Sequence, residues 1–102
     1  MIPQEPIEGL VPPNTAESLR AYIETGRPTG GFLKAVLSND LFGAYARADV
    51  ENVAALPALV RWVYNNAPRL CWGSEDRVED WMKMKRENAA LARLIEADPR
   101  WS

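Results

Sequence analysis

Residues that begin and end helices recur at short intervals along this chain, and they limit what it can fold into. Asparagine, aspartate, threonine or serine stands before each stretch in which apolar residues return every three or four positions, as helix N-caps do. No stretch alternates apolar and polar residues between hairpin turns. The sequence therefore predicts an all-α fold: a compact bundle of about five helices with an extended proline-rich N-terminal arm and a long C-terminal helix.

Capping residues mark where the predicted helices begin and end. Gly26 is expected to end the first helix in the left-handed conformation, which glycine adopts without steric cost. The third helix is predicted over residues 41–48 and the last over residues 75–97. The expected N-caps are, in chain order, Asn14, Thr29, Asp40, Asp49 and Ser74.

The fourth predicted helix contains a proline, Pro57. This proline either kinks one continuous helix or serves as the first residue of a new one, and we favour the continuous helix. The residues expected to face the core are Val53, Leu56, Leu59, Val60 and Val63.

The last predicted helix is long for a chain of this size. At 1.5 Å per residue it would extend about 35 Å, so we expect its far end to contact another chain. A basic patch at Lys83, Lys85 and Arg86 is interpreted as a solvated face, with an interface for an acidic partner as the alternative. The expected apolar stripe is Val78, Trp81, Met82, Leu91, Leu94 and Ile95.

Residues 1–13 contain four prolines, which forbid a helix and favour an extended arm. Residues 14–102 are predicted to form a single helical domain. The arm either lies over the core, which is the interpretation we favour, or docks on a second subunit.

Composition excludes several kinds of chemistry. The chain has no histidine and a single cysteine, Cys71. It therefore lacks the usual general base, the usual partner in a Ser or Cys triad and the ligands for a tetrahedral zinc site. We predict no catalytic residue, no metal site and no cofactor, and we expect Cys71 to be a small buried hydrophobe.

Charge and hydropathy exclude two classes of partner. A formal net charge of −2 argues against binding to duplex nucleic acid. No apolar run is long enough for a membrane helix, and the first residues do not form a signal-peptide pattern. We expect an intracellular protein that binds neither duplex nucleic acid nor a membrane.

The stretch "PTGGF" would begin the second helix with two glycines, although glycine is a poor helix former. With Thr29 as the N-cap, the backbone amides of Gly30, Gly31 and Phe32 would be free to hold an anion at the positive end of the helix dipole. The missing Cβ atoms would let a phosphate come close. The alternative is that the glycines allow the first and second helices to cross closely.

Further residues would complete such a site. Trp72 lies in a polar loop, where it either closes the core or stacks on a ring such as a nucleobase. Polar side chains at helix ends can read the edges of a ligand, although each is also an ordinary cap, and Arg27 or Arg69 would neutralise a phosphate. The predicted ligand-binding residues are Arg27, Thr29, Gly30, Gly31, Phe32, Asn39, Asp40, Asn65, Asn66, Arg69 and Trp72.

The stretches "RPTGGFLKAVLSNDL", "ARADVEN" and "YNNAPRLCWGS", with a valine and a tryptophan after them, resemble a family of small proteins without an assigned function carried by tailed phages and prophages. The likeness covers residues 19–81. It implies an accessory phage protein in the cytoplasm of a bacterial host. Such proteins often blunt host defence, either by sequestering a nucleotide second messenger in a non-catalytic oligomer or by binding and blocking a host protein.

Two functions follow as predictions, and a hydrolase that uses carboxylates with magnesium is the remaining catalytic alternative. The first is a non-enzymatic homo-oligomer, assembled through the long C-terminal helix or the N-terminal arm, that binds a small anionic ligand such as a host defence signalling nucleotide. The second is a protein–protein interaction module that binds and inhibits or regulates a host or phage protein. In the second case the glycines serve only packing.

Overall fold

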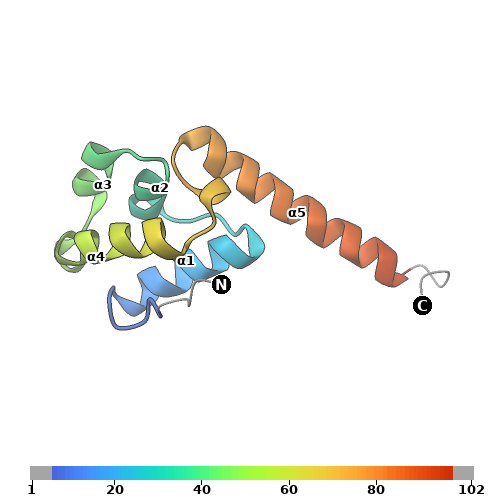
Figure 1. Cartoon of the computed structure of the whole chain (residues 1–102), viewed down its shortest axis with the longest axis horizontal. Helices are drawn as coiled ribbons and strands as arrows, with labels where there is room; N and C mark the ends of the chain where they lie inside the picture. Colours follow the sequence, from blue (N-terminus) through green and yellow to red (C-terminus); the bar gives the residue numbers. More distant parts are fainter. Residues whose placement is uncertain (1–5, 98–102) are drawn as a thin grey trace.

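The structure is a computed structural model that describes residues 6–97 of the chain, with side chains as far as Leu94 (Figure 1). The described residues form five α-helices, one short 3-10 helix and no β-strand, so the predicted all-α fold is confirmed. The elements are α1 Pro13–Thr25, α2 Gly31–Leu37, α3 Leu41–Arg47, α4 Val50–Asn66, η1 Arg69–Cys71 and α5 Glu75–Ala97.

The core lies between α1, α2, α4 and the first turns of α5 (Figure 1). Ala44 is the only buried residue of α3, which therefore sits at the edge of the core. The second half of α5 projects away from the other helices, and the molecule measures 52 × 27 × 23 Å. The largest fully buried side chains are Ile7, Leu19, Tyr22, Leu37, Leu59, Cys71 and Val78.

Tyr22 joins three segments that are far apart in the sequence. Its hydroxyl donates a buried hydrogen bond of 2.7 Å to the backbone carbonyl of Cys71 in η1. Its own backbone carbonyl accepts a bond of 3.2 Å from the indole nitrogen of Trp81 on α5. A buried polar group that loses its partner costs about 1–3 kcal/mol, so these bonds hold α1, η1 and α5 in one arrangement.

Three of the predicted N-caps are confirmed. The carboxylates of Asp40 and Asp49 accept hydrogen bonds from backbone amides three residues later, at 2.9 and 2.8 Å. The Ser74 hydroxyl accepts from the amide of Arg77 at 3.2 Å. α4 runs through Pro57 without a break, as expected for one continuous helix.

The predicted N-caps Asn14 and Thr29 are wrong. α1 begins at Pro13 with Pro12 as its N-cap, because proline fits the first helical position, where its missing N–H costs nothing. α2 begins at Gly31 with Gly30 as its N-cap, and no side chain caps it. Gly30 has the extended backbone of an N-cap, a position that glycine fills about as well as threonine.

The close helix approach occurs at a different glycine from the one expected. A Cβ atom on Gly30 would meet nothing within 4 Å, and one on Gly31 would meet only the Arg47 side chain of α3. The idea that these glycines let α1 and α2 cross is therefore wrong. Gly26 instead brings α1 against α5, because its Cβ would lie 2.7 Å from the Cβ of Lys85.

The described part of the arm, residues 6–12, packs on the core. Ile7 and Val11 are buried in the same cluster as Leu19. Glu8 accepts a hydrogen bond of 2.8 Å from the Arg20 guanidinium on α1, which holds the pKa of its carboxyl below the usual range. These residues are not extended throughout: the amide of Leu10 donates a hydrogen bond of 3.0 Å to the carbonyl of Ile7, and Pro13, predicted to belong to the arm, begins α1. The predictions for residues 1–5 fall outside the described part.

We expect Tyr22→Phe to lower the free energy of unfolding by about 1–3 kcal/mol, because the carbonyl of Cys71 would lose its buried donor. Urea denaturation followed by circular dichroism measures the change. Tyr45→Phe is the matched control, since Tyr45 is exposed and should shift the midpoint little. Equal effects of the two substitutions would contradict the role given to Tyr22.

We expect Gly26→Ala to destabilise the chain by more than about 1–2 kcal/mol, because the cost of a left-handed conformation for an L-residue adds to the clash of its Cβ with the Cβ of Lys85. Gly30→Ala makes the same chemical change where the backbone is extended and the space is open. It should alter the free energy of unfolding by less than about 0.5 kcal/mol. Thermal melts of the two variants compare them directly, and a larger loss at Gly30 would refute this account.

Candidate functional site

The structure separates nine of the eleven predicted ligand-binding residues into two groups, and Asn66 and Arg69 belong to neither. Arg27 and residues 29–32 lie in the connection from α1 to α2 and at the start of α2, away from the depression that the second group lines. Asn39, Asp40, Asn65 and Trp72 line a depression beside α3 and α4. The predicted single site is therefore not assembled as one pocket.

The glycine turn is open but flat. Gly30 and Gly31 are both exposed. The side chain of Arg47 lies over Gly31, and its guanidinium donates a hydrogen bond of 3.2 Å to the carbonyl of Gly43. Arg47 is thus a base near the start of α2 that the sequence analysis missed, because its position depends on how α3 folds back over α2. Anion binding at this turn stays a prediction.

Several of the polar residues are explained by local backbone structure. Asn39 has a positive φ of 65°, which asparagine tolerates better than most residues. It lets the chain turn from α2 into α3, and Asp40 caps α3. The Asn66 amide donates to the carbonyl of Trp62 at 3.1 Å, within the end of α4. These roles account for the three residues without a ligand.

Arg69 and Arg27 are both exposed. Arg69 lies in η1, where its backbone carbonyl accepts a long hydrogen bond of 3.4 Å from Arg77. Neither arginine lines the depression beside α3 and α4. Neither Arg27 nor Arg69 therefore lies beside Trp72 in this depression, as the predicted phosphate-binding role would require.

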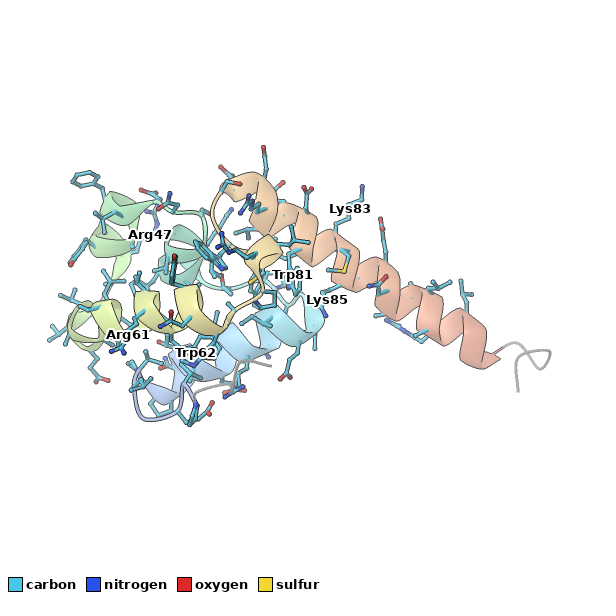
Figure 2. All side chains as sticks on the ribbon, in the orientation of Figure 1. Arg47, Arg61, Trp62, Trp81, Lys83 and Lys85 are labelled. Atoms are coloured by element: carbon cyan, nitrogen blue, oxygen red, sulfur yellow. The ribbon has the colours of Figure 1, made fainter. Side chains whose placement is uncertain are left out.

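The principal feature of the surface is an apolar groove between α3 and α4. One end is a pocket of about 230 Å³. The groove continues along α4, past Pro57 and Arg61 (labelled in Figure 2) to Asn65. We call this feature the α3–α4 groove. Its apolar lining comes from Val36, Leu41, Tyr45, Leu56, Val60, Val63, Tyr64 and Trp72, with Ala44 between them.

Large apolar side chains at the groove are exposed to solvent. Leu41 and Tyr64 are 58% and 65% exposed, and Tyr45 and Val60 are close to half exposed. Val60 was predicted to face the core, as was Val53, and both expectations are wrong because α3 leaves this side of α4 uncovered. The pairs Leu41–Tyr45 and Val60–Tyr64, each four residues apart on one helix face, were the sequence signal for the groove.

An aromatic pair forms one wall of the groove. The rings of Tyr64 and Trp72 are 5.9 Å apart between centroids and tilted by 53°. The indole N–H of Trp72 is buried, and no hydrogen-bond partner for it occurs in the described structure. Trp72 is half-buried and packs against the core cluster as well as lining the groove. It therefore closes the core on one side and offers a ring face to the groove on the other.

The described residues offer little for covalent or metal chemistry. No cluster of three or more Cys, Asp or Glu side chains among them is arranged to hold a metal ion. Burial raises the pKa of the Cys71 thiol to about 11, so this thiol stays protonated and is a poor nucleophile. The prediction that Cys71 is a buried hydrophobe is confirmed.

Comparison with protein-family models, curated proteins and solved structures found no match to this chain. Among the described helices, none combines the length and the apolar character that a membrane span requires. The likeness to small phage proteins therefore stays a prediction. The α3–α4 groove is the feature from which function is argued below.

We expect the stability of the chain to fall as the pH rises from about 9 to about 11, because the unfolded thiol of Cys71 loses its proton before the buried one does. Below that range both forms are protonated and Cys71 contributes no pH dependence. Denaturation curves across this range, compared with Cys71→Ala, measure the effect. A slope that is unchanged in Cys71→Ala would contradict the buried state of the thiol.

Proposed function

We propose that the chain is a non-enzymatic protein–protein interaction module whose α3–α4 groove binds an apolar helical face of a partner. The supporting observation is the concentration of half-exposed or exposed apolar side chains around one concave feature. Contiguous apolar surface of this kind is costly in water and marks interaction sites in soluble proteins.

The shape and chemistry of the groove favour a helix as the partner. The groove is lined by residues of α3 on one side and continues along α4 from the pocket to Asn65. Amphipathic helices bind in such grooves by placing apolar side chains three, four and seven residues apart along it. Tyrosine and tryptophan, here Tyr45, Tyr64 and Trp72, are enriched among the residues that contribute most to such interfaces.

The groove is a poor receptor for a nucleotide phosphate. Its lining is mainly apolar, and the carboxylate of Asp40 lies at its edge. Arg61 is the one base among its lining residues, and the glycine turn predicted to cradle phosphate lies elsewhere. Within the setting implied by the resemblance to phage proteins, the module would bind and inhibit or regulate a host or phage protein.

Site-specific photocrosslinking in bacterial cells tests this function. A photoreactive phenylalanine analogue at position 64 should form discrete covalent adducts, because it lies at the exposed wall of the groove. The same analogue at Glu17, an exposed position of α1, is the matched control. Adding Val60→Asp should abolish the adducts from position 64, because a charge in the apolar groove would have to be desolvated on binding.

Adducts that are identical from positions 64 and 17, or that survive Val60→Asp, would refute the proposed site. A nucleotide-dependent rise in melting temperature that is lost in Gly30→Trp would support ligand binding at the glycine turn instead, since binding to the native state stabilises it. The two readouts therefore distinguish the module from a nucleotide-sequestering protein.

A further inference from the structure

The second half of α5 is a helix without covering partners in the described structure. Every residue from 86 to 94 is exposed, and Figure 1 shows this part of the helix pointing away from α3 and α4. We call residues 86–94 the α5 tail. Isolated helices of this length are only marginally stable in water, so a partner that packs along the tail would stabilise it.

The α5 tail presents an apolar face of its own. Leu91 and Leu94 are 56% and 69% exposed. With Glu87 they follow the four-and-three spacing of a single helix face. At 3.6 residues per turn, Leu91 lies roughly 140° around the axis from Val78, which packs into the core. Leu91 and Leu94 therefore form a second face, apart from the part of the predicted apolar stripe that packs into the core at Val78 and Trp81.

The exposed part of α5 carries a small positive charge. Residues 86–94 contain two bases, Arg86 and Arg93, and one acid, Glu87, a net charge of +1. At the groove, Asp40 offers a carboxylate to the basic flank of the tail, and Arg61 offers a base to Glu87.

The length of the groove is similar to the length of the apolar face on the α5 tail. From Leu56 to Asn65 the groove follows α4 for about 13 Å, and from Glu87 to Leu94 the tail face covers about 10 Å, at 1.5 Å per residue. The tail of the same chain points away from its own groove (Figure 1). The groove of a second copy is therefore the one that the tail can occupy.

We propose that the α5 tail of one copy binds in the α3–α4 groove of a second copy, with Leu91 and Leu94 against Leu41, Val60 and Tyr64. This inference rests on the proposed function, because it names the partner of the same groove. In a two-fold pair the contact forms twice, since each copy supplies one tail and one groove. The protein is then a self-associating module.

Sedimentation velocity of the purified full-length chain and two variants tests the proposal. Leu94→Glu disables the tail, and Val60→Asp disables the groove. Each variant alone should be monomeric under conditions in which the natural chain dimerises. An equal mixture of the two should recover a dimer, because a tail and a groove remain intact on opposite partners. Leu70→Asp, at an exposed apolar residue outside the groove, should leave dimerisation unchanged.

Other outcomes overturn the proposal. The proposal is overturned if the natural chain stays monomeric over a wide range of concentration. A dimer that is lost in Leu94→Glu but kept in Val60→Asp would also overturn it, because the tails would then pair with each other and not with the groove. Two monomeric variants whose mixture does not recover a dimer would exclude the tail–groove contact. Circular dichroism of each variant verifies that the helices are retained.

The crosslinking experiment separates failure of this inference from failure of the proposed function. Adducts from position 64 with the mass of two chains support both. Adducts of another mass, together with a monomeric purified chain, leave the interaction module in place and reject self-association. The absence of any groove-dependent adduct and of any dimer rejects both.

Discussion

The buried hydroxyl of Tyr22 is the contact on which the arrangement of this molecule depends. It bonds to the carbonyl of Cys71, while the backbone of the same residue accepts a bond from Trp81. These two bonds attach α1 to the 3-10 turn and to the start of α5. Because an unpaired polar group in the core would be costly, the chain after α4 has one favourable path. That path sets the direction in which α5 leaves the globule.

The direction of α5 has a consequence for the opposite side of the molecule. The first turns of α5 cover the core beside α1 and η1, so they leave α3 and the outer side of α4 uncovered (Figure 1). α3 has only seven residues and buries only Ala44. Apolar side chains at Leu41, Val60 and Tyr64 therefore stay exposed. The same packing creates both an unfilled groove and an uncovered helix, which is why we propose that one fills the other in a second copy.

Much of the helical organisation follows from local chemistry and could be predicted. Asp40, Asp49 and Ser74 act on amides three residues away, and Gly26 adopts the left-handed conformation expected of it. The error at Thr29 comes from the glycine next to it, which caps a helix about as well as threonine. The error at Asn14 comes from Pro13, which fits the first helical position and lets the helix begin before Asn14. The candidate site was less predictable. Its polar residues were predicted from their hydrogen-bonding chemistry, yet Asn39, Asp40 and Asn66 turn the chain or bond to backbone groups at helix ends.

The sequence by itself determined that the chain is helical and where most helices begin, because capping and apolar spacing act over three or four residues. It also determined that the chain lacks histidine, with the limits that this sets on chemistry. Only the tertiary structure decided which apolar residues are covered, as with Val60, Leu91 and Leu94, since a helix carries no information about what packs on each of its faces. Burial of a face requires a neighbour, and neighbours come from distant parts of the chain or from another molecule.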